Sequence, residues 1–240
     1  MTPTPSSPRP LAWITGGATG IGFEAAPLLA GQGFRLEQEA GADVQTAPLD
    51  VADAAAVAEV ATRISANGPP EVLVLAAGIN LPRRHWRDLD AEGFARISRV
   101  NLEGVASCIT AVLPGMRQRG AGSIAVIGSW AGWRFTDFTG PAYSATKFAL
   151  ASVVESLNSQ EGVNGIRATL VCPGEVATPI LRSRPIPPSD EEIGRMLRPE
   201  DVAAAVLYAV TAPCHVCINE LVISPRWNRM YVGGEDLKRR

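Results

Sequence analysis

Hydrophobic and polar positions follow two different periods along this chain. Short apolar runs typical of buried strands are separated by segments in which apolar residues recur every three or four positions, as in helices that cover a core. The expected strands span residues 11–15, 44–49, 72–76, 123–129, 167–172 and 220–224, and the expected helices span residues 21–30, 54–64, 91–117, 143–160 and 199–210. This alternation predicts the α/β class, with a doubly wound parallel sheet and helices on both faces.

Length and composition indicate one folded domain. The chain has 240 residues, of which 46% are hydrophobic and 19% charged, as in ordinary globular proteins. We expect one domain over residues 11–240 after a flexible tail, residues 1–10, which is too rich in proline for a signal peptide. Dispersed charges with a formal net charge of -2, and the lack of a long apolar run, disfavour nucleic-acid and membrane partners. A cytoplasmic protein is therefore expected.

The four cysteines raise the question of a metal or redox site. The segment Cys214-His215-Val216-Cys217 has a suggestive spacing, but a structural zinc site needs four ligands and the chain has only two histidines. The absence of an export signal favours reduced thiols. We expect buried thiols and no metal site.

One stretch is too short for the expected topology. After the first helix the next clear strand begins at Val44, whereas a dinucleotide-binding half-fold has another strand and a crossover helix in between. If residues 34–37 formed that strand, only residues 38–43 would remain for a crossover that needs roughly a dozen. We therefore expect that residues are missing between Phe34 and Arg35, either deleted from the chain or omitted from the numbering. Residues 35–40 would then be the tail of the lost helix.

A glycine-rich segment joins the first strand to the first helix. Residues 15–22 read Thr-Gly-Gly-Ala-Thr-Gly-Ile-Gly, with glycines at 16, 20 and 22 rather than in the GxGxxG spacing. Glycine permits positive φ and close backbone approach, and a helix N-terminus offers N–H groups to a phosphate. A purely structural turn uses the same residues, but the strand-turn-helix context favours nucleotide binding.

Tyr143 and Lys147 are the candidate proton-transfer pair. Residues four apart share a face of a helix, so the two polar ends can converge. A nearby ammonium is expected to lower the tyrosine pKa from its ordinary value of about 10, which makes Tyr143 a usable general acid and base. Ser129, at the end of a predicted strand, can donate a hydrogen bond to the substrate oxygen. A turn residue is the alternative for Ser129, and a chance surface pair is the alternative for Tyr143 and Lys147.

Together with Asn101 and Pro173-Gly174, these motifs resemble the short-chain dehydrogenase/reductase family, which has a single-domain Rossmann-like fold, over nearly the whole chain. The resemblance implies an oxidoreductase that transfers a hydride between NAD or NADP and an alcohol or carbonyl substrate. It implies that Ser129, Tyr143, Lys147 and Asn101 are catalytic, that Lys147 also holds the nicotinamide ribose, and that Asn101 holds a water. It places the cofactor on Gly16, Ala18, Thr19, Gly20, Ile21, Gly22, Asp50, Val51, Ala76, Ala77, Gly78, Tyr143, Lys147, Pro173, Gly174, Val176 and Thr178. It also implies a homodimer or homotetramer.

The chain departs from the family pattern at several positions. The family usually has asparagine in place of Ala76, and its serine lies 13 residues before the tyrosine, whereas the gap is 14 here with a tryptophan at 130. For Asn101, an amide that bends the helix is the alternative. At the position of Thr19, NADP-preferring members of the family often have a basic residue, so the threonine slightly favours NAD over NADP. Glu37 and Glu39 lie near the position of a ribose-binding acid but are interpreted as helix residues, so the choice between NAD and NADP stays open.

Several residues are candidates for the substrate site. We expect some of the aromatic residues after Ser129 to form a substrate wall, with a role in the core as the alternative: Trp130, Trp133, Phe135 and Phe138. Arg83, Arg84 and His85 could meet an anionic substrate, but an exposed polar loop is the preferred interpretation. Glu175 is a further polar candidate near the nicotinamide. Residues 182–190, interrupted by three prolines, form either a plain connector or a substrate lid.

Two other functions compete with a dehydrogenase or reductase. A non-catalytic nucleotide-sensing relative would keep the fold, but the presence of Ser129, Tyr143 and Lys147 argues against it. A nucleotide-sugar epimerase or dehydratase also uses a tyrosine and a lysine four residues apart, but the glycine spacing and the short C-terminal region disfavour it.

Overall fold

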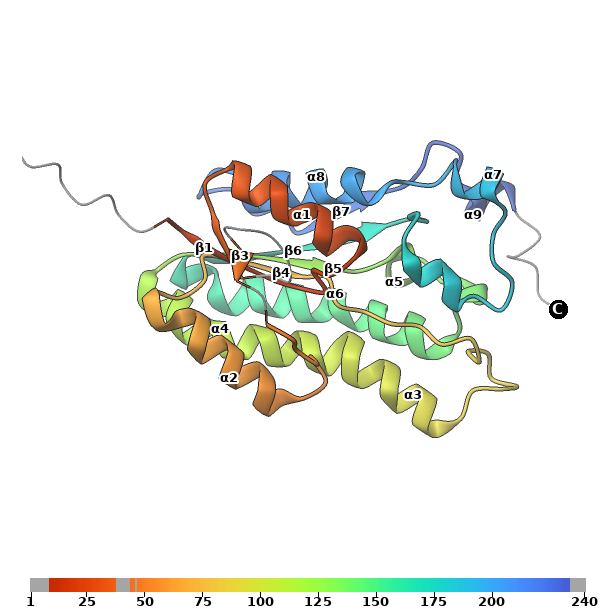
Figure 1. Ribbon diagram of the computed structural model, residues 1–240, viewed down its shortest axis with the longest axis horizontal. Coiled ribbons are helices and arrows are strands. Elements are labelled where there is room, and N and C mark those ends of the chain that lie inside the picture. The colour runs from red at the N-terminus through yellow and green to blue at the C-terminus, as the bar shows by residue number, and fades with distance from the viewer. Residues whose placement is uncertain (1–8, 38–43, 46, 234–240) are drawn as a thin grey trace, which may run out of the picture.

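A parallel sheet forms the centre of the molecule. The computed structural model describes residues 9–37, 44–45 and 47–233. In this part of the chain, seven strands lie in the order β3-β2-β1-β4-β5-β6-β7, and all neighbours are parallel (Figure 1). The strands are β1 (Leu11–Thr15), β2 (Arg35–Glu37), β3 (Val44–Gln45), β4 (Val72–Leu75), β5 (Gly122–Ile127), β6 (Ile166–Pro173) and β7 (Glu220–Ile223). The strand order reverses between β1 and β4, and such a reversal opens a crevice at the carboxyl ends of the strands.

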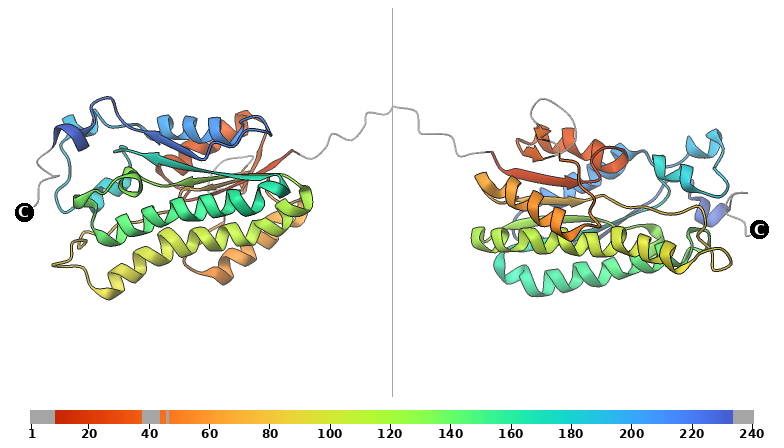
Figure 2. Two further views of the ribbon diagram at one scale, coloured as in Figure 1. Left: turned by 180° about the vertical axis from the view of Figure 1, so that it is seen from behind. Right: turned by 60° about the horizontal axis from the view of Figure 1, so that its bottom comes forward.

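Helices cover both faces of the sheet, which confirms the predicted doubly wound architecture. One face carries α1 (Gly20–Gly31) and α8 (Pro199–Val210), and the other carries α2 (Ala54–Ile64), α4 (Gly104–Arg119) and α6 (Pro141–Glu161) (Figures 1 and 2). Four shorter helices complete the described chain: α3 (Ala91–Ser98), α5 (Trp130–Trp133), α7 (Asp190–Ile193) and α9 (Arg229–Val232). Among them, α5, α7 and α9 lie at the end of the sheet where the parallel strands finish (Figure 1).

The core is divided by the sheet into two apolar layers. Leu73 and Leu75 of β4 belong to the layer under α2, α4 and α6, whereas Val72 and Val74 belong to the layer under α1 and α8. All four side chains are buried, because successive residues of a strand point to opposite faces and both faces are covered. This is why the central strands read as continuous apolar runs in the sequence.

The predicted helix tail at residues 35–40 is wrong. Arg35–Glu37 form β2, and Leu11 pairs with Arg35 in parallel register while the Arg35 amide donates to the Pro10 carbonyl at 2.7 Å. Ladder bonds to β1 and the burial of Leu36 outweigh the weak strand preference of these polar residues. In the full sequence of 240 residues Arg35 follows Phe34 directly, so no residues are omitted between them. A deletion in the chain stays a prediction, since residues 38–43 lie outside the described residues.

Two further expectations about elements need correction. The strand expected over residues 44–49 is described only at Val44–Gln45. The single helix expected over residues 91–117 is divided into α3, a π-helical segment at Arg99–Glu103, and α4. The π-helical segment contains the buried Asn101, whose amide is engaged outside the helix, and such wide turns arise where one extra residue is accommodated.

The cysteines divide into two environments. Cys108 and Cys172 are buried, and burial raises the pKa of each thiol to about 12. Cys214 and Cys217 are exposed, so the prediction that they are buried is wrong: their segment is a loop between α8 and β7 that the core does not cover. Within the described residues, no helix is long and apolar enough to cross a membrane.

Candidate functional site

A cavity of about 440 Å³ lies at the carboxyl ends of the strands. Its lining joins the glycine segment before α1, the segments after β4, β5 and β6, and the start of α6. Most of the predicted site residues lie on it: Gly16, Thr19, Gly20, Ile21, Ala76, Ala77, Gly78, Ser129, Tyr143, Lys147, Pro173, Gly174, Val176 and Thr178. A second hollow of about 750 Å³ is lined by Ala18, Asp50 and Val51, and it shares Gly16, Ala77 and Gly78 with the first. Gly22 and Asn101 line neither of the two.

The glycine segment is packed too tightly for larger residues. Gly16 has φ +68°, and a Cβ there would lie 2.6 Å from the amide nitrogen of Ala77. A Cβ on Gly22 would lie 2.5 Å from the Gly16 carbonyl oxygen. Real Cβ atoms do not approach backbone atoms so closely, so glycine is required for the contact between the turn and the segment after β4. Gly22 therefore supports the cavity wall from behind.

The first turn of α1 is not capped by a side chain. Thr19 is its N-cap residue but makes no side-chain capping bond, and the turn holds no acidic residue. In contrast, Asp53 caps α2 by accepting from two amides, and Asp90 caps α3. The first N–H groups of a helix have no partner within the helix and attract anions. The uncapped turn, beside a glycine wall with no room for side chains, fits a dinucleotide pyrophosphate.

Lys147 lies in the interior of the site. Its Nζ donates to the Ile127 carbonyl oxygen at 2.7 Å and lies 5.7 Å from the centre of the Tyr143 ring. Burial lowers the pKa of Lys147 to about 8. Gly132 of α5 packs against the Lys147 backbone so closely that a Cβ there would collide with it. Lys147, on the same helix as Tyr143, is therefore held by the end of β5 at its Nζ and by α5 at its backbone.

The expectation that Lys147 lowers the pKa of Tyr143 is wrong for this geometry. Burial raises the pKa of the Tyr143 hydroxyl, and the groups that partly offset this effect are the hydrogen bond with Ser129 and the charges of Arg84 and Arg184. The phenol therefore holds its proton near neutral pH, which suits a group that gives a proton to a substrate oxygen.

Ser129 is a turn residue that also contacts Tyr143, and its hydrogen bond to a substrate oxygen stays a prediction. Its Oγ accepts from the Ala131 amide at 3.1 Å and thereby caps α5, while the hydroxyl also hydrogen-bonds to Tyr143. The short helix α5 lies between Ser129 and Tyr143 in the chain. Two of the four aromatic residues line the cavity, Trp130 and Phe138, whereas Trp133 packs against the core and Phe135 is exposed.

Asn101 is committed to the backbone after β4. Its Oδ1 accepts from the Ile79 amide at 2.8 Å, and its Nδ2 donates to the Ile79 carbonyl at 2.9 Å. A Cβ on Gly78 would lie 3.5 Å from the asparagine Oδ1 and 3.7 Å from Lys147 Nζ, so Asn101 is close to the lysine. The π-helical segment therefore contains the residue whose side chain contacts the backbone beside the site. Its water-holding role remains a prediction.

Arg84 does not lie in an exposed polar loop, which its sequence context favoured. Arg83 is exposed as expected, but Arg84 is only 3% exposed and lines the cavity with Tyr143. Burial, followed by the charge of Arg184, lowers the pKa of Arg84 to about 10. Its Nη2 donates to the carbonyl and the hydroxyl of Ser183, 99 residues away. No local pattern predicts such a contact, so the position of Arg84 could not be read from its neighbours.

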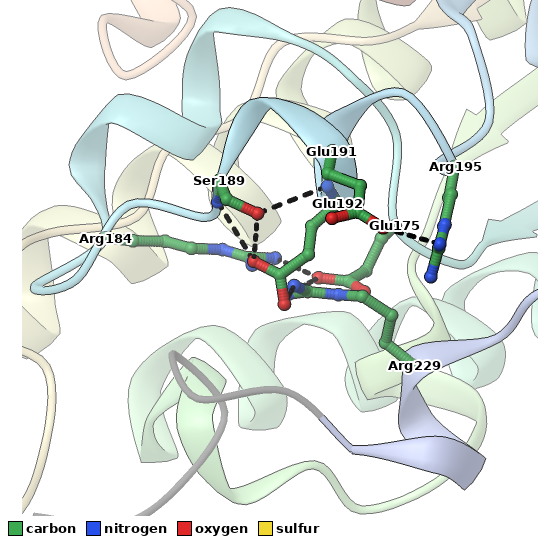
Figure 3. Close-up of polar contacts among 7 residues, drawn as sticks. All are labelled: Glu175, Arg184, Ser189, Glu191, Glu192, Arg195 and Arg229. Carbon is green, nitrogen blue, oxygen red and sulfur yellow. Dashed lines mark hydrogen bonds and ion pairs between the residues drawn. The ribbon is translucent and has the colours of Figure 1, made fainter.

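Glu175 is the centre of a buried charge cluster rather than a free polar group (Figure 3). Its carboxylate pairs with Arg184 at 2.8 Å and with Arg229 through two bonds of 2.7 and 3.1 Å. Arg229 also pairs with Glu192 at 2.5 Å, and Glu192 forms a capping box with Ser189 at the start of α7. The cluster ties the loop after β6, α7 and α9 together. Residues 184–189 are a loop between the 3-10 helix Pro179–Ser183 and α7, and whether it acts as a connector or a substrate lid stays a prediction.

Known proteins match this chain over most of its length. A family model described as short chain dehydrogenase matches residues 10–187. An uncharacterized oxidoreductase of Staphylococcus saprophyticus is 30% identical over 90% of this chain and 97% of its own length. The glycine betaine reductase of Emericella nidulans is 30% identical over 94% of this chain, which spans 20% of that longer protein. A solved structure, the closed form of serine dehydrogenase complexed with NADP+, has a TM-score of 0.80 at 28% identity and covers 90% of this chain and 94% of its own.

Proposed function

We propose, from the premise that this chain belongs to the short-chain dehydrogenase/reductase family, that it interconverts a small alcohol and its carbonyl compound with Tyr143 as the acid and base. The chain is an oxidoreductase that binds NAD(P), and the bound cofactor supplies or accepts the hydride. The proposal rests on one observation above the others. Tyr143, whose hydroxyl is hydrogen-bonded to Ser129, lines the same cavity as the glycine segment.

The cofactor would lie along the two hollows, which share Gly16, Ala77 and Gly78. The uncapped first turn of α1 and the glycine segment would hold the pyrophosphate. Asp50 and Val51, which line the larger hollow, would contact the adenine end. Lys147, Gly174 and Thr178 line the cavity on the side of Tyr143 and would surround the nicotinamide ribose and ring.

The proton chemistry follows from the state of the side chains. In carbonyl reduction, Tyr143 gives its phenolic proton to the oxygen as the hydride reaches the carbon, and Ser129 donates a hydrogen bond to the same oxygen. Lys147 lies beside the Tyr143 ring, with its Nζ held by the Ile127 carbonyl oxygen, and would bind the nicotinamide ribose. In alcohol oxidation the same steps run in reverse.

The decisive experiment removes the Tyr143 hydroxyl. In Tyr143→Phe, turnover on a panel of alcohols and ketones, followed at 340 nm, is expected to fall by about 100- to 10,000-fold, the usual contribution of general acid–base catalysis. Cofactor binding, measured by fluorescence titration, is expected to stay within about twofold because the ring remains. Tyr208→Phe is the control, since Tyr208 is exposed on α8. Turnover that survives in Tyr143→Phe would assign the proton transfer to another group. Wild-type protein that binds cofactor without turnover would favour the nucleotide-sensing alternative.

We also propose a cytoplasmic homodimer or homotetramer. All four cysteines are free thiols, as is usual for proteins of reducing compartments. The long helices α4 and α6 lie side by side on one face, and Phe148 of α6 is partly exposed there. Light scattering at micromolar concentration tests the assembly, and a monomeric mass would refute it.

A further inference from the structure

Arg84 is a buried cation that lacks a carboxylate partner. Within the described part of the chain, no aspartate or glutamate lies at ion-pair distance from it, although it is only 3% exposed. Its hydrogen bonds run to uncharged oxygens: from Nε to the Leu81 carbonyl at 2.7 Å and from Nη2 to the carbonyl and hydroxyl of Ser183. Burying a charge without an opposite charge is costly. A fold that retains such a group usually has a use for it.

Arg84 lines the cavity and has a donor nitrogen that its bonds to Leu81 and Ser183 do not use. A guanidinium carries five N–H donors, and the bonds to Leu81 and Ser183 use only Nε and Nη2. The remaining nitrogen, Nη1, donates to no group among the described residues. It also does not belong to the side-chain nitrogen and oxygen atoms of the described residues that are buried without a hydrogen-bond partner. It is therefore accessible, and the accessible space beside Arg84 is the cavity that it shares with Tyr143.

The surrounding charges leave this side of the cavity positive. In the nearby cluster Arg184 and Arg229 pair with Glu175 and Glu192. Arg84, in contrast, forms no ion pair among the described residues, and the carboxylate whose charge acts on it, that of Asp88, lies beyond ion-pair distance. Arg184 also lines the cavity, with its guanidinium 5.0 Å from the centre of the Phe138 ring. Its charge acts unfavourably on Arg84. An anion in the cavity would relieve this repulsion and provide the missing opposite charge.

We propose that Arg84 binds a carboxylate of the substrate, so that the alcohols and carbonyl compounds taken by this enzyme are small hydroxy acids and oxo acids. This inference rests on the proposed function and names its substrate class. The planar guanidinium matches a carboxylate with two parallel hydrogen bonds. A cavity of about 440 Å³, which the nicotinamide end of the cofactor would share, restricts the substrate to a small molecule.

The carboxylate position is fixed relative to the reacting oxygen. Arg84 is held at its side chain by Leu81 and Ser183, and its backbone packs against Gly140, where any Cβ would collide with the Arg84 carbonyl. Gly140 is the N-cap of α6, one turn before Tyr143. The spacing between arginine and tyrosine therefore selects the number of carbons between the carboxylate and the reacting carbon.

The test compares acids with their neutral esters. The panel consists of 2-, 3- and 4-hydroxybutyrate, each beside its methyl ester, with NAD+ and NADP+. For the best pair, the acid is expected to exceed the ester in kcat/KM by about 10- to 100-fold, as charge-assisted hydrogen bonds imply. Arg84→Gln is expected to abolish this preference, so that the acid loses about 10- to 100-fold more kcat/KM than its ester does. Arg83→Gln, at the exposed neighbour, is the matched control and should keep the preference.

Each other outcome overturns the inference. If an ester reacts as well as its acid, or if Arg84→Gln lowers kcat/KM equally for both, then Arg84 does not bind the substrate carboxylate. Turnover of neutral alcohols but of no acid would reject the inference while the proposed function stands. If no compound reacts, the proposed function fails, and calorimetry with butyrate decides on the anion site alone: equal heats for wild type and Arg84→Gln overturn it. Arg84→Lys, which keeps the charge, replaces the glutamine variant if that variant does not fold.

Discussion

Glu175→Gln removes the shared carboxylate of the buried cluster while it preserves the shape of the side chain. Two guanidiniums, those of Arg184 and Arg229, lose their partner in this variant. The Glu175 and Arg229 side chains are each 2% exposed, so water cannot replace the lost charge. The fold therefore keeps a buried cation that no longer has adequate compensation.

The size of the effect follows from the burial of the cluster. Removal of one partner from a buried pair costs about 3–5 kcal/mol, whereas exposed pairs contribute about 0–1 kcal/mol. The pair of Glu191 with Arg195 is exposed, at 76% and 46%, and lies beside the buried cluster in Figure 3. Glu191→Gln is thus a matched control with an expected loss below about 1 kcal/mol. For a chain of this size, the Glu175→Gln loss corresponds to a Tm decrease of roughly 6–20 °C.

The assay is urea unfolding of both variants and the wild type, followed by far-UV circular dichroism and by near-UV signals of the aromatic residues. The near-UV signal reports on α9, because Tyr231 packs edge-on against Trp130 with ring centres 5.6 Å apart. A loss in Glu175→Gln no larger than in Glu191→Gln would refute the reasoning. As a further check, Glu175→Leu combined with Arg229→Met should recover part of the loss, since the buried cation Arg229 is removed, whereas Arg184 still loses its bond to Glu175.

Two pH-dependent predictions follow from other ionisable groups. The pKa of Lys147, lowered by burial to about 8 from 10.5, means that the unfolded chain binds more protons between these values. Wild-type stability relative to Lys147→Met should therefore rise as pH increases from 8 to 10.5, and parallel urea midpoints would contradict this. The hydrogen bond from Arg117 lowers the pKa of Glu161 to about 2 from 4.5. The stability that Glu161 contributes is present above pH 4.5 and lost toward pH 2, so Glu161→Gln should flatten the acid limb of a melting-temperature profile.

Local patterns explain which parts of the fold were predictable. The helices α2 and α8 match their predicted bounds, since Asp53 caps one and Pro199 begins the other. Tyr143 and Lys147 lie on one helix because their spacing of four places them on one face. These features depend on interactions between residues close in the chain.

Features that depend on distant residues were not predictable in the same way. Arg84 is buried because Ser183 and the turn before α6 cover it, and Glu175 meets Arg229 across 54 residues of chain. The strand Arg35–Glu37 exists because β1 offers it a ladder. No periodicity or composition of the segment itself contains that information.

The π-helical turn around Asn101 makes chain length a part of the site. Each residue of a helix turns it by about 100°, so loss of one residue from this turn would rotate α3 by that amount relative to α4. Asn101 would then point away from Ile79, and the backbone after β4 would lose the amide that holds it. A substitution at this turn changes one side chain, whereas a deletion changes the register of a whole helix. The same site can therefore tolerate varied residues near this turn while it requires a fixed number of them.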